Sequence, residues 1–268
     1  MCNELELTEK FGFNMNTINL IQFTDRFEKA LSATDYTDEI KKLKEKYDVG
    51  TLSDEGLKRT LNFVTVYKNI ADEMDSDVLA SECWSCMPLG VGAVPCLAMS
   101  ILSDMGYIVT CESDIHGAIT NALLMCATRG EAVPVFGEFT VRHPENENAE
   151  LLWHCGPFPY SIKDKTVKAK LIDGKPSFKA KDGEYTIARF QADSGKYKLL
   201  GGTFTTVPGP HTFGTYMWAE FKNWSKLERK MIEGPYIHHM SEIYGKYDAV
   251  LREFCKYVPE LEFDPLEE

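Results

Sequence analysis

The stretch Tyr107-Ile108-Val109-Thr110-Cys111-Glu112-Ser113-Asp114 decides the fold class of this chain. Its first half is a short apolar run that predicts a buried strand, and a helical pattern follows from Ile115 to Thr128. Earlier in the chain, Val78-Leu79-Ala80 predicts another buried strand, and Pro95 suits the first turn of a helix that ends at Gly106. This alternation of strand and helix predicts an α/β layer with parallel strands.

Further helices are predicted ahead of this layer. Apolar spacing with a charged outer face indicates helices from Leu20 to Leu31 and from Glu39 to Tyr47. Ser53 has N-cap chemistry and precedes a longer helix, from Gly56 to about Met74. By contrast, Phe11-Gly12-Phe13-Asn14 predicts a strand-to-helix junction already inside a domain.

The pattern changes after about residue 132. Short strands are predicted at Val133 to Val141, Leu151 to His154, Thr166 to Leu171, Tyr185 to Phe190 and Lys196 to Val207. Asp-Gly pairs between them are hairpin turn signals. Helical character returns from about Glu242 to Tyr257. We therefore expect an α/β domain over residues 1–132 and a mainly antiparallel, β-barrel-like domain with a terminal helix over residues 133–268.

Charge and composition exclude several classes of partner. The 268 residues include 41 acidic and 29 basic side chains, a net charge of −12, so an acidic surface repels nucleic acid and anionic membrane. No apolar run approaches the roughly 20 residues that span a bilayer. The acidic N-terminus lacks the pattern of a secretory signal. The eight cysteines lie mostly in apolar stretches, which is typical of reduced, buried thiols in a cytoplasmic protein.

Two glutamates are the first candidates for chemistry. Glu112 follows a buried strand directly, where ligands gather in open α/β sheets and where an ionised carboxylate needs a partner. Asp114 is explained by capping the following helix. Glu138 stands between two phenylalanines on a predicted strand, as an outward-facing residue or a deliberately buried acid. It lies 26 residues after Glu112, which leaves room for a helix and a return strand that bring both acids to the same sheet end.

Histidines supply the second kind of candidate. His154 ends a predicted strand, and the adjacent His238 and His239 precede the last predicted helix. Neighbouring side chains point in different directions, so we expect at most one of this pair to enter a given site. Two carboxylates with one or two neutral imidazoles suit Mn²⁺, Mg²⁺ or Co²⁺.

The motif Cys83-Trp84-Ser85-Cys86 permits a different interpretation. A CxxC near strand–helix alternation is typical of thiol–disulfide redox sites. However, the next predicted helix begins near Pro95, too far along the chain to lower a thiol pKa through its N-terminus. Cys96, Cys111 and Cys155 offer no second CxxC for a zinc site. We therefore expect neither redox nor zinc chemistry at this motif.

Five short motifs occur in an order that resembles a known family. They are Glu82-Cys83-Trp84, Cys111-Glu112-Ser113-Asp114, Gly137-Glu138-Phe139, His154-Cys155-Gly156 and Gly234-Pro235-Tyr236-Ile237-His238-His239. Together they resemble the C-terminal part of the L-fucose isomerase family and its L-arabinose isomerase relatives, over nearly the whole chain. The resemblance implies fucose isomerase-like middle and C-terminal domains. It also implies a metal-dependent aldose–ketose isomerase acting on a pentose, a 6-deoxyhexose or a modified hexose.

The same resemblance implies roles for single residues. Glu112 and Glu138 would bind Mn²⁺, or Mg²⁺ or Co²⁺, and would transfer protons. Either His239 or His238 would be a further metal ligand, and His154 resembles an additional ligand of the arabinose branch. Fucose isomerases carry aspartate where this chain has Glu138, so the carboxyl group here is carried on a side chain that is one methylene longer.

Substrate binding is the least defined part of this expectation. Trp84 and Trp153 would supply apolar walls for the sugar, although packing in the core explains them equally well. Family members normally carry a further N-terminal α/β domain, and this chain is expected to begin after it. The implied partner is therefore a homo-oligomer, or a separate chain that supplies the missing domain. A non-catalytic sugar-binding or regulatory subunit is the alternative function.

Overall fold

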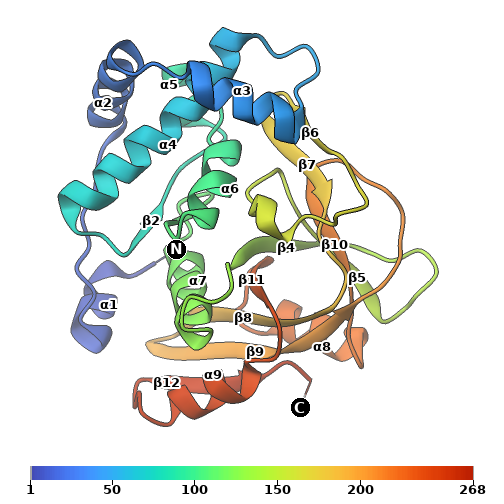
Figure 1. Ribbon diagram of the computed structural model, residues 1–268. Coiled ribbons are helices and arrows are strands. Elements are labelled where there is room, and N and C mark those ends of the chain that lie inside the picture. Colours follow the sequence, from blue (N-terminus) through green and yellow to red (C-terminus); the bar gives the residue numbers. More distant parts are fainter. Residues whose placement is uncertain (1, 268) are drawn as a thin grey trace.

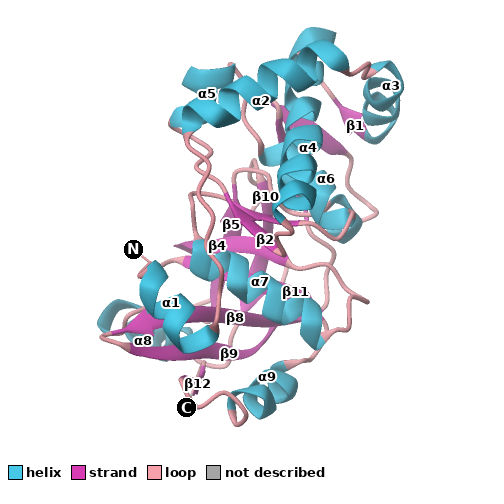
Figure 2. Ribbon diagram, turned by 90° about the vertical axis from the view of Figure 1, so that its left-hand side faces the viewer, coloured by secondary structure: helices cyan, strands magenta, loops and turns pink. Residues whose placement is uncertain are grey.

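Helices dominate the first part of the chain. The computed structural model describes residues 2–267, and its early helices are α1 (Glu4–Phe11), α2 (Leu20–Ala33), α3 (Thr37–Lys46), α4 (Asp54–Met74), α5 (Cys86–Val91) and α6 (Cys96–Asp104). Helices α2 to α6 gather at one end of the molecule and most of the sheet lies at the other (Figure 2). Among residues 2–267, no helix is both long enough and apolar enough to cross a membrane.

The helices predicted from Leu20 to Leu31, from Glu39 to Tyr47 and from Gly56 to Met74 are confirmed, and so is the Ser53 cap. The Ser53 hydroxyl accepts a hydrogen bond from the Gly56 N–H at 3.1 Å and starts α4, one face of which is buried. The junction predicted around Phe11 is wrong, because α1 ends there. Gly12 has φ +72°, the left-handed conformation that closes a helix and that glycine adopts without strain.

A small parallel sheet joins the helical part to the rest. Strands β2 (Val78–Ala80) and β3 (Ile108–Thr110) pair in parallel, with α6 between them in sequence and α7 (Ile115–Ala127) following β3. The predicted strand–helix alternation is thus confirmed. Helix α7 lies in the middle of the molecule (Figure 1), where it contacts this sheet on one side and the large sheet on the other.

The large sheet is mostly antiparallel and closes on itself. Its strands are β1 (Tyr47–Asp48), β4 (Val135–Arg142), β5 (Ala149–His154), β6 (Ala169–Ile172), β7 (Lys175–Lys179), β8 (Glu184–Asp193), β9 (Lys196–Thr206), β10 (Thr215–Glu220), β11 (His239–Tyr244) and β12 (Leu261–Pro265). The order β10-β5-β4-β11-β8-β9 is antiparallel throughout, and β10 also pairs with β9. These six strands form a ring, so the expected barrel-like arrangement is present.

One predicted element is wrong in type. The residues from Glu242 were predicted to begin a helix, but β11 runs through Tyr244, and α9 begins only at Asp248 and ends at Cys255. Five of the six residues of β11 are buried, because α7 covers one face and the barrel core covers the other. A strand that is buried on both faces shows no alternation of apolar and polar residues, so its sequence pattern does not reveal it.

Several elements are not among those predicted from the sequence. They include α1, α5, β1, β7, β10, β12, the 3₁₀ helix at Tyr160–Ile162 and the helix α8 (Trp224–Glu233). The division at residue 132 falls between α7 and β4 and stays a prediction. The largest hydrophobic cluster contains residues from both sides of it, such as Leu61, Leu97 and Tyr185.

A buried carboxyl on β11 gives a prediction for stability. Glu242 is 0% exposed, and neither of its oxygens accepts a hydrogen bond, although the backbone N–H groups of Gly137 and Glu242 lie nearby. Burial raises the pKa of Glu242 well above its usual value. The folded protein therefore holds a proton that the unfolded chain releases, and this favourable contribution is lost as pH rises above the unfolded pKa of 4.5.

We expect Glu242→Met to be more stable than the wild type. An apolar side chain of similar length removes the unsatisfied carboxyl, which costs about 1–3 kcal/mol. The gain in melting temperature should be larger at pH 8 than at pH 5, measured by circular dichroism. Equal melting temperatures of the two proteins across this range would contradict the assignment of a buried, unpaired carboxyl.

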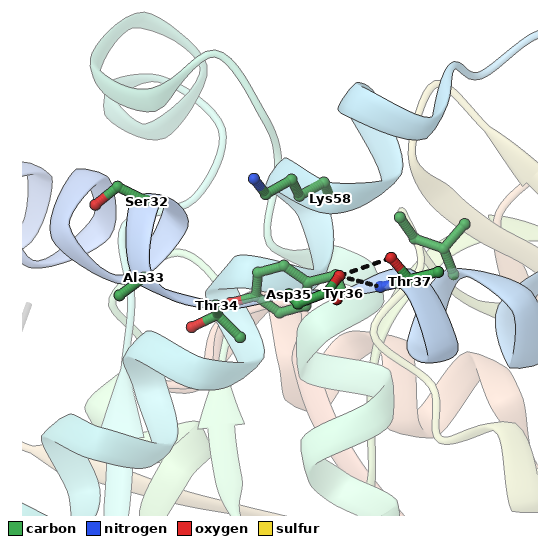
Figure 3. Close-up of a pocket in the computed structure, with 8 residues that line it drawn as sticks. Ser32, Ala33, Thr34, Asp35, Tyr36, Thr37 and Lys58 are labelled. Carbon is green, nitrogen blue, oxygen red and sulfur yellow. Dashed lines mark hydrogen bonds between the residues drawn. The ribbon is translucent and has the colours of Figure 1, made fainter.

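An open hollow lies at the turn between α2 and α3 (Figure 3). It encloses about 480 Å³ and is lined by Ser32, Ala33, Thr34, Asp35, Tyr36, Thr37, Ile40 and Lys58. The Asp35 carboxylate accepts hydrogen bonds from the backbone and hydroxyl of Thr37, at 3.0 and 2.6 Å. These hydrogen bonds hold the first residue of α3, so the turn that begins this helix explains the polar side chains of the hollow.

Candidate functional site

Three neighbouring strands place a row of functional side chains on one face. In the antiparallel ladder, Glu138 of β4 lies directly opposite Trp153 of β5 on one side and His239 of β11 on the other. Residues directly opposite each other in such a ladder project to the same face of the sheet. The strand register therefore brings a tryptophan, a carboxylate and an imidazole together, although the three residues lie far apart in sequence.

The loop between β3 and α7 brings Glu112 to the same place. Glu112 and Ser113 have φ angles of +59° and +54°, a left-handed conformation that non-glycine residues rarely adopt. The Ser113 N–H donates to the Ser81 carbonyl at 3.0 Å, which holds the loop against the end of β2. Two strained residues in succession are typical of loops that are fixed for function.

Asp114 follows in this loop and starts α7. Its carboxylate accepts a hydrogen bond from the Gly117 N–H at 2.9 Å, so the predicted helix cap is confirmed. A Cβ at position 117 would lie 2.5 Å from the Phe136 ring and 2.8 Å from the Asp114 carboxylate. Glycine at this position lets α7, β4 and Asp114 approach closely.

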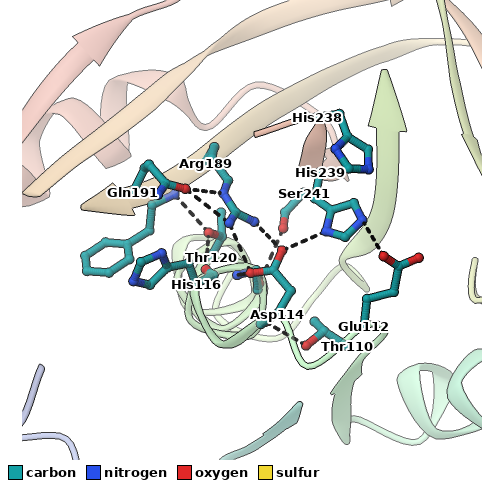
Figure 4. A network of polar contacts seen from close by, with 12 residues as sticks. Thr110, Glu112, Asp114, His116, Thr120, Arg189, Gln191, His238, His239 and Ser241 are labelled. Atoms are coloured by element: carbon teal, nitrogen blue, oxygen red, sulfur yellow. Dashed lines mark hydrogen bonds and ion pairs between the residues drawn. The ribbon is translucent and has the colours of Figure 1, made fainter. Parts of the chain in front are cut away.

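Asp114 also joins a buried network that the sequence does not reveal (Figure 4). Arg189 of β8 is 1% exposed and donates to both Asp114 oxygens, and His239 Nδ1 lies 3.0 Å from the same carboxylate. Burial alone would raise the pKa of Asp114, but the bonds from His239 and Arg189 outweigh it and hold this pKa well below the usual value. The carboxylate is therefore ionised at neutral pH.

The ionised Asp114 fixes the orientation and tautomer of His239. An ionised carboxylate can only accept hydrogen bonds, so Nδ1 of His239 carries the proton and donates it. In the neutral ring, Nε2 then has a free lone pair. This atom is buried without a hydrogen bond, 3.6 Å from a Glu112 oxygen and 3.8 Å from a Glu138 oxygen. While the ring is neutral, this lone pair faces the carboxyl groups of Glu112 and Glu138.

His238 lies beside this arrangement but has a different environment. Its side chain is 57% exposed, against 4% for His239, and its Nε2 is 3.2 Å from Glu138 Oε2. Burial alone would raise the pKa of Glu138, but the His238 bond and nearby imidazoles outweigh it, so this pKa lies below its usual value. His238 is therefore a partner of the Glu138 carboxylate.

His154, at the end of β5, is buried close to the same groups. Ligand atoms of Glu112, His154 and His239 all lie within 4.8 Å of one another, as do those of Glu138, His238 and His239. His154 Nδ1 accepts a hydrogen bond from the Cys155 N–H at 2.9 Å, and Nε2 has no partner. In the neutral ring, this bond assigns the proton to Nε2, so His154 is a hydrogen-bond donor toward the site.

The predicted site residues therefore come together, but not in the predicted way. Glu112 and Glu138 were expected at one end of a common sheet, which is wrong, because β3 and β4 belong to different sheets. Glu112 and Glu138 meet because α7 lies between the two sheets and contacts β3 as well as β11 and β4. Trp153 stands in the same row as Glu138, whereas Trp84 is 70% exposed on the loop before α5. Whether Trp84 reaches a ligand stays a prediction.

Comparison with known proteins gives this site a context. No protein-family model matches the chain. Among curated proteins it is 30% identical, over 254 residues, to the sulfoquinovose isomerase of Priestia megaterium (strain ATCC 12872 / QMB1551). It is 28% identical, over 204 residues, to the sulfoquinovose isomerase of Alkalicoccus urumqiensis. The chain is related to sugar isomerases.

The similarity covers a larger share of this chain than of its relatives. The similarity to the Priestia megaterium sulfoquinovose isomerase covers 91% of this chain but 56% of that protein. For the Alkalicoccus urumqiensis protein the two shares are 73% and 45%. The chain thus spans about half the length of the sugar isomerases that it matches.

Proposed function

We propose that this chain carries the catalytic centre of a metal-dependent aldose–ketose isomerase that acts on a sulfonated sugar. The observation that carries the proposal is the unsatisfied Nε2 of His239, which faces the Glu112 and Glu138 carboxylates. A divalent cation would satisfy all three groups at once. The relationship to sulfoquinovose isomerases supports the reaction class and the kind of sugar.

The donor set suits a hard or borderline divalent cation. Carboxylate oxygens and imidazole nitrogen are the ligands that Mn²⁺ binds in proteins, and Mg²⁺ and Co²⁺ fit the same set. In this proposal Glu112, Glu138 and His239 hold the ion. Asp114 lies behind His239 as the carboxylate that orients a metal-binding imidazole. Such an ion would polarise the sugar carbonyl and stabilise the negative charge that develops on the sugar oxygens.

The two carboxylates also have the properties needed to move protons. Isomerisation through an ene-diol transfers a proton between neighbouring carbons and another between the two oxygens. Glu138 is ionised at neutral pH, because its pKa is lowered, and it can accept a proton from carbon. Glu112 is the more exposed of the pair, with 36% of its side chain accessible against 15%, and can exchange the hydroxyl proton. His154 Nε2 would donate a hydrogen bond to a sugar oxygen.

An isomerase assay with a sugar panel tests this function. The purified chain, with and without Mn²⁺, would be incubated with sulfoquinovose, L-fucose, L-arabinose and D-glucose, and ketose formation would be followed by NMR. We expect turnover of sulfoquinovose that stops on addition of a chelator and returns with Mn²⁺. Turnover that a chelator leaves unchanged would contradict metal dependence, and preference for L-fucose or L-arabinose would contradict the sulfonated substrate.

A non-catalytic sugar-binding or regulatory subunit is the second candidate. The observation that favours it is that this chain spans about half the length of its relatives. In that case sugar binding without turnover is expected, and activity would appear only with a partner that completes the pocket. The proposed homo-oligomer, or a separate chain, would be that partner. Gel filtration together with the assay distinguishes these arrangements.

The adjacent histidines give a matched pair of variants. His239→Ala removes the proposed ligand itself, so we expect the Mn²⁺ affinity to fall by more than the roughly 100-fold that loss of an outer partner can cost. His238→Ala removes only a partner of Glu138, so we expect a smaller loss, of about tenfold. Titration monitored by the electron paramagnetic resonance of free Mn²⁺ measures both. A larger loss in His238→Ala than in His239→Ala would reverse the assignment.

A further inference from the structure

Four thiols from separate parts of the chain form a row beside the candidate site. We call Cys83, Cys111, Cys155 and Cys96 the thiol row. The sulfurs of Cys155 and Cys96 are 3.4 Å apart, those of Cys155 and Cys111 lie within 4.8 Å of each other, and Cys83 lies near Cys111. All four are free cysteines. Cys83 lies near Cys111 and Cys155, while its CxxC partner Cys86 begins α5.

The structure corrects one expectation from the sequence and adds to another. The helix after the CxxC was expected near Pro95, but α5 already begins at Cys86, where the Glu82 carboxylate accepts its N–H at 2.9 Å. Cys96, Cys111 and Cys155 were set aside because they form no second CxxC. In the structure they nevertheless converge, from the start of α6, the end of β3 and the end of β5.

We propose that Cys96 and Cys155 are an oxidisable pair that forms a disulfide, and that this disulfide weakens metal binding at the neighbouring site. Cys155 is half-buried and is the member that a small oxidant can reach, whereas Cys96 is 2% exposed. With a peroxide as oxidant, the Cys155 thiol becomes a sulfenic acid and releases water. The Cys96 thiol then attacks that sulfur, forms the S–S bond and releases a second water.

His154 connects this pair to the site. The Cys155 N–H donates to His154 Nδ1 at 2.9 Å, and the Cys155 sulfur is 3.3 Å from the same nitrogen. A disulfide bond requires the sulfurs of Cys96 and Cys155 to approach from 3.4 Å by roughly 1.4 Å. When the Cys155 sulfur moves, the contacts of its sulfur and its N–H with the His154 ring must shift as well. His154 in turn lies within 4.8 Å of ligand atoms of Glu112 and His239.

The Cys96–Cys155 disulfide and its effect on metal binding are tested in separate experiments on the full chain. Reduced protein would be treated with hydrogen peroxide, alkylated and mapped by non-reducing peptide mass spectrometry. We expect a peptide pair joined through Cys96 and Cys155, lighter by two hydrogens than the reduced pair. It should form in the wild type and in Cys126→Ser, which replaces an exposed thiol, but not in Cys96→Ser. A cross-link from Cys155 to Cys111, or oxidation of Cys155 without a cross-link, would overturn the pairing.

The effect on metal binding rests on the proposed function and has its own readout. We expect the oxidised wild type to bind Mn²⁺ about tenfold more weakly than the reduced protein, with recovery in dithiothreitol. Peroxide-treated Cys96→Ser should keep the affinity of the reduced protein. Unchanged affinity in a cross-linked sample would overturn the coupling. Failure of the reduced wild type to bind Mn²⁺ would instead overturn the proposed function, while the peptide map would still decide the pairing.

Discussion

Replacing Glu112 by glutamine is expected to abolish both Mn²⁺ binding and isomerisation. Glutamine keeps the size of the side chain but removes the charge that faces His239 Nε2 at 3.6 Å. In the proposed mechanism it also removes a group that exchanges protons, which contributes about 10²–10⁴-fold to a rate. We therefore expect kcat/KM for sulfoquinovose to fall by at least about 10²-fold.

Thermal unfolding provides the binding readout for the same variant. A ligand that binds only the folded state at about 100 times its dissociation constant stabilises it by roughly 2.7 kcal/mol. Mn²⁺ should raise the melting temperature of the wild type and leave that of Glu112→Gln unchanged. Glu147→Gln, which alters an exposed glutamate, is the matched control and should respond like the wild type. Equal Mn²⁺ responses of Glu112→Gln and the control would exclude Glu112 as a ligand.

Asp114→Ala is expected to have the largest effect on folding stability. The substitution leaves the Arg189 guanidinium, which is 1% exposed, without its carboxylate, and it also removes the cap of α7. Breaking a buried ion pair from one side costs about 3–5 kcal/mol. We expect a melting temperature well below that of the wild type, measured by circular dichroism without added metal.

Two further variants separate the roles of Asp114. Asp114→Asn keeps the shape and the cap but not the charge, so we expect a smaller loss of stability together with a loss of about 10–100-fold in Mn²⁺ affinity. Asp114→Leu combined with Arg189→Met removes both charges and should be more stable than Asp114→Ala. An Asp114→Ala protein as stable as the wild type would show that Arg189 finds another partner.

The sequence determines those features of this protein that depend on neighbouring residues. The apolar run before Thr110, the cap chemistry of Asp114 and the helix that follows are set by contacts within a few residues. They place Glu112 in the turn between a strand and a helix, where the structure has it. The residue types of the candidate site, carboxylates and imidazoles, could also be proposed from the sequence, because the chemistry of a side chain depends on its type.

The tertiary structure alone decides which of these residues meet. Which of His238 and His239 is buried beside Glu112 depends on the register of β11 against β4, which places His239 opposite Glu138. The role of Asp114 beyond its cap depends on Arg189, 75 residues away, and the closest thiol pair is 59 residues apart. Such pairings are fixed by the closure of the barrel and by the burial of β11 on both faces. Neither leaves a periodic pattern in the sequence of a single segment.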